Sequence, residues 1–443
     1  MKFLKQVDPE IDRLIKLEKK RQAETLMMIP SENIASRAVE EAIGSVLGNK
    51  YAEGYPQKRY YQGQSIVDQV ESLVIERAKK LFDVPAANVQ PLSGSPANFA
   101  VFTALLQPGD TLMGLSLQSG GHLTHGAQLN ASSKYFNSVP YEVTRDGMID
   151  YVALRKQVKQ VKPKLIIAGT TAYARLLEWE KFAEIADEVG AYLMADVAHV
   201  AGLIAANAYP SPVPFAHVVT TTTHKTLRGP RGALILTTRK GLLKDPQMAE
   251  KIDKAIIPGI QGGPHINTIA GIGVALKEAT TKRYQAYAKQ IVANAKVLAD
   301  ELASYGFHLV TGGTDCHLVL IDLRNKNLLG NTVATGCEMA NIVLNRNAVP
   351  FDTNPPFSPS GIRLGTPGIT TRGMKQKDMK QIAKWIHLAT EGLMASKKDL
   401  GISDEEERKK SFRQRIFDNT KILHVLQKEV KALCAKYPIP DMY

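Results

Sequence analysis

The sequence predicts an α/β protein whose mostly parallel sheet carries helices on both faces. Between about residues 84 and 238, short apolar segments alternate with helical segments, the pattern of βαβ units. A smaller α/β unit should follow, closed by long C-terminal helices. The expected strands are Thr111–Gly114, Leu165–Gly169, Tyr192–Ala195, Val218–Thr223 and Ala233–Thr238 in the first part, and His317–Leu323 and Gly361–Leu364 in the second.

The helical segments suggest three parts. Residues 7 to about 24 have apolar residues at helical spacing and predict an N-terminal arm helix. Phe99–Leu106 predicts an apolar helix, and the chain turns helical again from Ile269 towards Leu302. We therefore expect an arm over residues 1–25, a large domain over 26–270 and a small domain over 271–443.

Composition narrows the class of protein. The 443 residues are 44% hydrophobic and 22% charged, as in ordinary globular proteins. No apolar run is long enough to span a membrane. After the first five residues the chain is charged, whereas a signal peptide would have an apolar segment there. The three cysteines are widely spaced and fit neither a zinc site nor a disulfide framework. We expect a reducing compartment, the cytoplasm, and no membrane partner.

The net charge of +13 raises the question of nucleic acid. The basic residues are spread along the chain, and the basic cluster Arg408–Lys410 follows the acidic run Asp404–Glu407. We interpret that mixture as a solvated helix face. Nucleic acid is therefore not expected as the main partner, whereas anionic small molecules would be attracted.

Lys225 has the strongest chemical signal. It follows the β-branched segment Val218–Thr223, which predicts that it emerges where a buried strand ends. Ligands of open α/β sheets bind at that edge. A partly desolvated lysine there can attack a carbonyl, which makes it a candidate Schiff-base nucleophile. Taken alone, it would be interpreted as a surface lysine.

A carboxylate is predicted near this lysine. Asp196 falls at the carboxyl end of the strand Tyr192–Ala195. Pyridoxal phosphate (PLP) requires such a group, because a carboxylate keeps its pyridine nitrogen protonated. His199 could hold the carboxylate in place. Alone, Asp196 is as typical of a helix N-cap, but beside Lys225 it indicates a cofactor site.

Small residues predict a phosphate-binding turn. Ser93, Gly94 and Ser95 precede the helix Phe99–Leu106, and hydroxyl and N–H groups at a helix start bind anions. Such a cap is common in isolation. With Asp196 and Lys225 it completes a set expected of PLP enzymes.

Further motifs extend the pattern over nearly the whole chain. They are Ser31–Asn33, Asn49–Pro56, Lys58–Tyr61, Gly120–Gly126, Asp196–Gly202 and Ser360–Pro367. With them, the sequence resembles the serine hydroxymethyltransferases. The resemblance implies a fold-type I, aspartate aminotransferase-like PLP-dependent transferase: a mostly parallel seven-stranded sheet flanked by helices, with a smaller α/β C-terminal domain. It also implies reversible interconversion of L-serine and glycine, the hydroxymethyl carbon passing to tetrahydrofolate to give 5,10-methylenetetrahydrofolate.

The resemblance implies roles for individual residues. Lys225 would hold PLP, Asp196 would pair with its pyridinium nitrogen, and His122 would stack on its ring, a structural histidine being the alternative. Glu53 would manage the proton on the hydroxymethyl oxygen, whereas without the neighbouring motif it would be an exposed loop glutamate. The other residues expected in catalysis or cofactor binding are Tyr60, Thr222, Ser93, Gly94, Ser95, Thr171, His199, His224, Tyr51 and Gly263.

Substrate contacts are implied in the same way. Arg363 would grip the amino-acid carboxylate with its bidentate fork, helped by Ser31 and Tyr61. Tyr51, Glu53 and Gly263 would act in the partner's site, which implies a homodimer. The expected folate contacts are Leu117, Gly121, Leu123 and Asn347.

Four positions depart from the family pattern. Gln57 and Gln62 stand where glycine is usual, and Thr171 and Ala174 where serine and often proline are found. Thr171 keeps a hydroxyl, so cofactor binding should survive. A glutamine would alter the loop if its site requires positive φ.

Two other functions fit part of the sequence. A folate-independent PLP aldolase acting on β-hydroxy amino acids or α-methylserine would share Lys225, Asp196 and Arg363, but the folate-side residues favour the transferase. A non-catalytic protein on the same scaffold would not need the full set of acid, base and carboxylate-binding residues.

Overall fold

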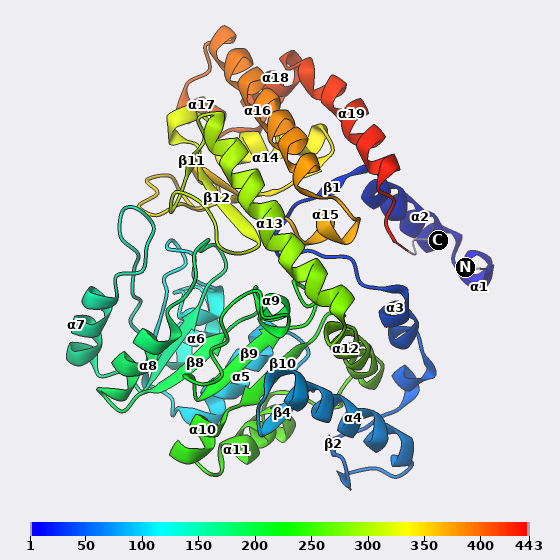
Figure 1. The fold of residues 1–443 in the computed structure, drawn as a ribbon, viewed down its shortest axis with the longest axis vertical. Helices are drawn as coiled ribbons and strands as arrows, with labels where there is room; N and C mark the ends of the chain where they lie inside the picture. Colours follow the sequence, from blue (N-terminus) through cyan, green and yellow to red (C-terminus); the bar gives the residue numbers. More distant parts are fainter. Residues whose placement is uncertain (1, 441–443) are drawn as a thin grey trace. The chain divides into compact units, whose positions relative to one another are not determined.

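The computed structural model describes residues 2–440 and divides the chain into two units (Figure 1). One unit combines the residues up to Ile34 with those from Ala293 onward, and the other spans Ala35–Val292. The three-part division expected at residues 25 and 270 stays a prediction.

A seven-stranded sheet forms the centre of the unit Ala35–Val292, as predicted. The strands β9, β8, β7, β5 and β6 run parallel, and β10 is antiparallel to both β9 and β4. In sheet order the strands are β4 (Ala86–Asn88), β10 (Ala233–Thr237), β9 (Val218–Thr222), β8 (Tyr192–Asp196), β7 (Leu165–Gly169), β5 (Thr111–Gly114) and β6 (Asn137–Ser138).

Helices cover this sheet, and three of its central strands are buried along their whole length. Every residue of β7, β9 and β10 is buried, as expected where both faces are covered. α5 (Gly94–Leu105) and α11 (Met248–Lys254) share one apolar cluster with the sheet, while α8 (Trp179–Asp187) packs on β7 and β8. The remaining elements are α3 (Arg37–Ile43), η1 (Val46–Asn49), β2 (Gly54–Tyr55), β3 (Lys58–Arg59), α4 (Ser65–Phe82), η2 (Leu123–His125), α6 (Ala131–Tyr135), α7 (Tyr151–Val161), α9 (Ala201–Ala205), α10 (Arg239–Lys244), η3 (Ala255–Ile260) and α12 (Ile266–Ala279).

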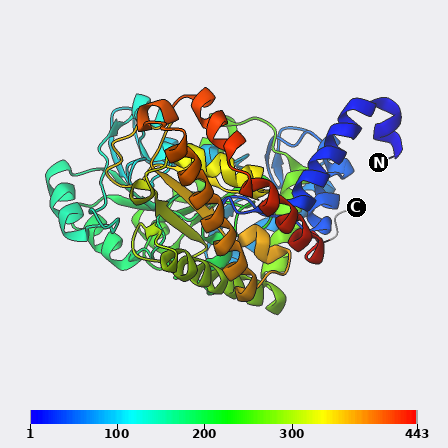
Figure 2. The same cartoon turned by 90° about the horizontal axis from the view of Figure 1, so that it is seen from above.

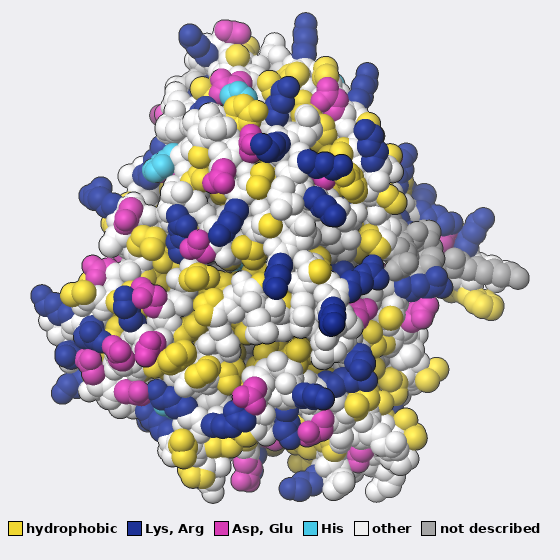
Figure 3. All heavy atoms as spheres, viewed as in Figure 1, with side chains coloured by type: hydrophobic (Ala, Val, Ile, Leu, Met, Phe, Trp, Pro, Cys, Tyr) yellow, Lys and Arg dark blue, Asp and Glu magenta, His cyan; other side chains and the backbone are white. Residues whose placement is uncertain are grey.

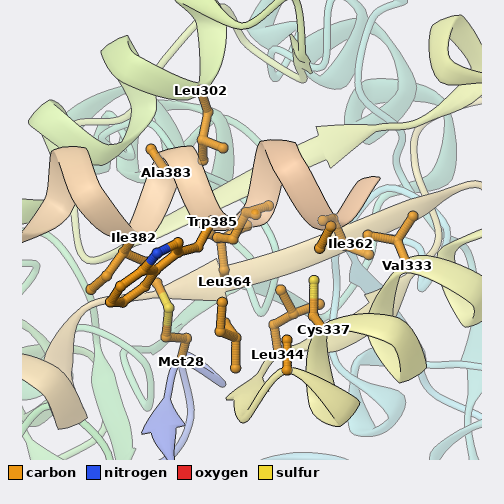
Figure 4. Close-up of a cluster of buried hydrophobic side chains, with 14 of the residues drawn as sticks. Met28, Leu302, Val333, Cys337, Leu344, Ile362, Leu364, Ile382, Ala383 and Trp385 are labelled. Atoms are coloured by element: carbon orange, nitrogen blue, oxygen red, sulfur yellow. The ribbon is translucent and has the colours of Figure 1, made fainter. Parts of the chain in front are cut away.

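The other unit is built on a four-stranded antiparallel sheet in the order β11-β12-β15-β14. Its core includes Met28, Leu302, Ile362, Leu364 and Trp385 (Figure 4). The strands are β11 (His308–Leu309), β12 (Leu318–Asp322), β14 (Asn345–Asn347) and β15 (Gly361–Gly365), with the separate parallel pair β1 (Leu26–Met27) and β13 (Ile342–Val343). The helices are α1 (Lys2–Val7), α2 (Pro9–Glu24), η4 (Arg324–Lys326), α14 (Gly330–Met339), α15 (Pro367–Thr371), α16 (Gln376–Asp399), α17 (Asp404–Glu407), α18 (Lys410–Asn419) and α19 (Ile422–Lys436). The helix α13 (Lys282–Ser304) begins in the unit Ala35–Val292 and ends in this one.

The N-terminal and C-terminal segments lie side by side in both cartoon views (Figures 1 and 2). Arg372 joins them, because its buried guanidinium donates to the carbonyls of Ala23, Thr25, Cys434 and Tyr437. The predicted arm helix therefore packs against distant parts of the sequence.

The interpretation of the charged run near residue 404 as a solvated helix face was wrong in two respects, although most of its residues are exposed. The run divides between α17 and α18, and Glu407 is fully buried. Its carboxylate accepts from Lys397 Nζ at 2.7 Å and from the N–H of Leu329 at 2.9 Å. A charge can be buried when such partners replace water.

On the face drawn in Figure 3, charges of both signs are mixed. Figure 3 shows Lys and Arg side chains scattered over one face, with Asp and Glu between them, a pattern typical of ordinary solvated surface rather than a nucleic-acid track. Within residues 2–440, no helix is long and apolar enough to cross a membrane, and no cluster of His, Cys, Asp and Glu could hold a metal ion.

Candidate active site

Four neighbouring parallel strands deliver the predicted residues to one edge of the large sheet. β5, β7, β8 and β9 pair in that order, so their carboxyl ends meet. Asp196 ends β8, and Lys225 follows β9 by three residues. Thr171 and the segment Leu117–Leu123 follow β7 and β5. This edge is where ligands of open α/β sheets bind.

A set of donors holds the carboxylate of Asp196. Oδ2 accepts from Asn98 Nδ2 at 2.9 Å and from His125 Nε2 at 3.0 Å, and Oδ1 accepts from the N–H of Ala198 at 3.1 Å. Burial raises the pKa of Asp196, but the hydrogen bond from His125, the electrostatic effect of His125 and His122, and the hydrogen bond from Asn98 together lower the pKa below its ordinary value. Asp196 is therefore an anion at neutral pH.

His122 lies next to this carboxylate in the turn that leads into η2. Its Nδ1 accepts from the N–H of Thr124 at 3.2 Å. Burial lowers the pKa of His122 to about 4; Asp196 opposes this shift, and His125 and Lys225 add to it. The imidazole is therefore neutral at physiological pH.

Lys225 is buried, and hydrogen bonds on both sides of it tie its segment to the segment that follows β8. Thr222 donates to the carbonyl of Ala198 at 3.3 Å, and Thr226 donates to the carbonyl of His199 at 2.8 Å. These bonds fix the end of β9 against the end of β8. At His224, burial together with neighbouring cations lowers the imidazole pKa to about 3.

The predicted phosphate turn begins α5. Ser93 is its N-cap, has extended backbone, and makes no side-chain hydrogen bond to the helix. Gly94 packs so closely on β9 that a Cβ would lie 2.8 Å from Thr222 Cγ2. The first N–H groups of this twelve-residue helix are thus suited to an anion.

A tight loop after β5 contains several expected folate contacts. Gly121 N–H donates to the carbonyl of Ser116 at 2.8 Å, and a Cβ on Gly121 would overlap the carbonyl of Leu115. Thr171 binds the loop, because its N–H donates to Gly120 O at 2.7 Å and its hydroxyl to Gly121 O at 3.1 Å. Leu117 and Leu123 remain exposed.

Tyr51, Glu53, Tyr60, Tyr61 and Gly263 form a second cluster in the same unit. The Tyr51 and Tyr61 rings meet edge to face, 5.4 Å between centroids. The Tyr51 ring lies 3.4 Å from the position of a Cβ on Gly263, and a hydrogen bond with Glu53 raises the Tyr51 pKa. The tyrosines are 59%, 65% and 48% exposed for Tyr51, Tyr60 and Tyr61.

A buried ionic network that the sequence analysis missed anchors this loop. Arg59 Nη2 donates to Glu71 at 2.5 Å, Nε donates to Asp68 at 2.9 Å, and Nη1 donates to the carbonyls of Ala52 and Gly54 at 2.8 Å. Burial raises the pKa of Glu71, and Arg59 opposes the shift. The network holds the backbone on both sides of Glu53.

Ser31, Asn347 and Arg363 belong to the other unit. Arg363 is buried in β15 and its Nε donates to Asn345 at 3.1 Å. Burial lowers its pKa to about 10, so it stays charged at neutral pH. Ser31 and Asn347 are half-buried.

Asn98 and His125 are site residues that sequence reasoning did not identify. Asn98 lies one helical turn after Gly94 on α5 and is buried. The sequence does place the Asn98 amide at the start of an otherwise apolar helix, directly after the predicted phosphate turn, which could have indicated a site residue. His125 could have been found from its place in the motif Gly120–Gly126. The role predicted for His199 stays a prediction.

The comparisons with known proteins agree with this geometry. A sequence model of the family described as serine hydroxymethyltransferase matches residues 4–386. The chain belongs to this family. It is 50% identical over 442 residues to a serine hydroxymethyltransferase of Desulfotalea psychrophila, covering 100% of this chain and 97% of the relative. It is 54% identical over 384 residues to one of Acidothermus cellulolyticus, covering 86% and 88%.

The enzyme is therefore a PLP-dependent, fold-type I hydroxymethyltransferase that interconverts serine and glycine with tetrahydrofolate as co-substrate. The residues at the sheet edge fit PLP: a buried lysine, a carboxylate kept ionised by its donors, and a helix start with an uncommitted serine cap. The aldolase and non-catalytic alternatives are set aside.

Proposed function

We propose that the edge formed by β5, β7, β8 and β9 holds the cofactor through Lys225. When bound, PLP supplies an electron sink for the bonds at the amino acid's α-carbon. Asp196 would hold a proton on the ring nitrogen, since its donors keep it anionic. Ser93, Gly94 and Ser95 would bind the phosphate at the start of α5.

We expect supporting roles for the other side chains at this edge of the sheet. His122 would present an uncharged ring to the cofactor face, supported by its lowered pKa of about 4. Thr171, His199 and His224 would complete the cofactor surroundings, and Thr222 would position the lysine through its bond to Ala198.

The amino acid and the folate require further groups. Arg363 would bind the substrate carboxylate through two charge-assisted hydrogen bonds, and Ser31 and Tyr61 would also contact the substrate. A buried arginine that stays charged supports this role. Folate would contact Leu117, Gly121, Leu123 and Asn347, two of which are exposed leucines.

Covalent mapping tests the cofactor site. Borohydride reduction of the PLP-loaded enzyme should fix the cofactor on Lys225, located by peptide mass spectrometry. Lys225→Ala should retain no reduced adduct, while Lys164→Ala, at an exposed lysine of the same unit, should be labelled normally. An adduct on any other lysine of the wild-type enzyme would contradict the assignment.

We further propose a homodimer in which Tyr51, Glu53, Tyr60 and Gly263 complete the partner's site. The support is a cluster of exposed tyrosines around a glutamate, unusual for free surface. Glu53 would manage the proton on the hydroxymethyl oxygen there.

Subunit mixing tests this arrangement. Lys225→Ala and Glu53→Gln subunits should each be inactive, and random mixing should restore about a quarter of wild-type activity, because half the dimers are hybrids with one intact site. No restoration, with hybrids verified by mass, would place Glu53 in its own subunit's site.

We also propose a cytoplasmic location. The support is the state of Cys316, Cys337 and Cys434, which are all buried thiols, as is usual in reducing compartments. Cell fractionation followed by immunoblotting would test this proposal.

A further inference from the structure

The side chain of Asn98 connects three parts of the site. Its Nδ2 lies 2.9 Å from Asp196 Oδ2 and 2.8 Å from Thr124 Oγ1, while its Oδ1 accepts from Thr220 Oγ1 at 2.7 Å. An ionised carboxylate accepts hydrogen bonds and cannot donate them. The NH₂ group of Asn98 must therefore face Asp196, and its second N–H then points at Thr124.

The orientation of this amide decides where the proton of Thr124 lies. Because Thr124 Oγ1 accepts from Asn98, its own O–H is available to His122 Nδ1, 2.8 Å away. The N–H of Thr124 also points at that nitrogen, at 3.2 Å. Two donors aimed at one ring nitrogen require it to carry no proton, so the proton of a neutral His122 lies on Nε2.

The same logic applies to His125. Its Nδ1 accepts from the N–H of His122 at 3.2 Å, so its proton lies on Nε2, which faces Asp196 at 3.0 Å. Nδ1 of each imidazole thus accepts a backbone N–H, and Asp196 accepts from Nε2 of His125.

We propose that Asn98 and Thr124 are positioning residues that hold His122 as a neutral imidazole protonated on Nε2. The tautomer follows from the hydrogen bonds alone. Its consequence, an uncharged ring beside the cofactor with the N–H on the side away from Thr124, rests on the proposed role of His122. The charged and titratable groups that face His122 are Asp196, His125 and Lys225. The network thus extends from α5 through η2 to β8.

Nitrogen NMR of protein with ¹⁵N-labelled histidine rings tests the tautomer directly. The enzyme has ten histidines, and the spectrum of a His122→Gln variant identifies the His122 signals. In the PLP-loaded enzyme and after cofactor removal, Nε2 should show the shift of a protonated nitrogen and Nδ1 that of an unprotonated one. A proton on Nδ1, or a charged His122 at pH 7, would overturn the proposal.

Thr124→Val removes the hydroxyl and keeps both shape and backbone N–H. It should shift the tautomer ratio of His122 towards Nδ1–H by roughly 3- to 10-fold, as expected for one lost hydrogen bond. Thr221→Val is the matched control: this buried threonine donates only to the carbonyl of Thr222 and should leave the His122 signals unchanged. An unchanged ratio in Thr124→Val refutes the role of Thr124.

The tautomer and the cofactor contact can fail separately. If His122 is Nε2-protonated but its signals do not move when PLP is added back, the network stands and the proposed stacking fails. If they move but the proton is on Nδ1, the stacking stands and the network fails.

Discussion

Replacing Arg59 with methionine tests whether the buried ionic network holds the Glu53 loop. The side chains of Arg59 and Glu71 are only 3% and 1% exposed, with 2.5 Å between Nη2 and Oε2. Removing one partner of such a pair costs about 3–5 kcal/mol, because the other charge stays buried. Methionine keeps most of the apolar length of the side chain, so the loss is mainly electrostatic.

The cost should depend on pH. Burial holds the pKa of Glu71 above its ordinary value, and losing Arg59 removes an opposing effect. A raised folded-state pKa means that the contribution is fully favourable below the unfolded pKa and is lost as pH rises through the folded pKa. The penalty of Arg59→Met should therefore be smallest near pH 5 and grow towards pH 8.

An exposed pair provides the control. Arg37 Nε lies 2.7 Å from Glu41 Oε1, but these side chains are 54% and 65% exposed. Arg37→Met should cost only about 0.3–0.5 kcal/mol. Adding Glu71→Met to Arg59→Met should recover part of the loss, because the unpaired charge is gone.

The two tryptophans allow each unit to be followed separately. Trp179 lies in the unit 35–292 and Trp385 in the other. In a Trp385→Phe background, urea unfolding followed by Trp179 fluorescence reports the unit that contains Arg59. Equal losses of stability in Arg59→Met and Arg37→Met would refute this reasoning. So would a loss of stability in Arg59→Met that does not change with pH.

Three further predictions follow. Arg363→Ala should weaken serine and glycine binding by about two to three orders of magnitude with PLP retained, measured by calorimetry; an equal effect from exposed Arg346→Ala in β14 would remove the specific role. Gln57 has a backbone φ of 65°, which strains a residue with a side chain. Gln57→Gly should therefore raise the free energy of unfolding, followed by Trp179 fluorescence, by about 0.5–1 kcal/mol. Gln62 has no positive φ, so the same gain from Gln62→Gly would contradict the strain argument. Burial raises the pKa of Asp253 to about 6, so its contribution to stability is lost as pH rises from about 4 to 6. Asp253→Asn should flatten the dependence of the unfolding free energy on pH in that range. An unchanged dependence would show that Asp253 does not cause it.

The central strands were predictable because their sequences are runs of apolar and β-branched residues. β5 and β7 span the predicted residues, and β8, β9 and β10 differ from the prediction by one residue at an end. The short edge strands β4 and β6 were not identified. Their two or three residues pair with neighbours already in place, and such pairing depends on the sheet more than on local sequence.

The site was predictable where a chemical group stands at the end of a strand. Asp196 and Lys225 met that condition, and the parallel order of β8 and β9 brings their strand ends together. Asn98 and His125 did not, because their hydrogen bonds to Asp196 span 98 and 71 residues. No periodicity within one segment encodes a bond of that kind.

The missed polar residues have one physical property in common. Arg59, Glu71, Asn98 and Glu407 are polar or charged, yet their side chains are buried because other buried or backbone groups replace water as hydrogen-bond partners. Sequence patterns assign such residues to solvent, since charge alone is costly to bury. Hydrophobic periodicity therefore predicts which strands form, whereas these buried polar contacts set where the connecting loops lie. In an enzyme whose reacting groups stand on loops, the geometry of catalysis then depends on the part of the sequence that is hardest to interpret.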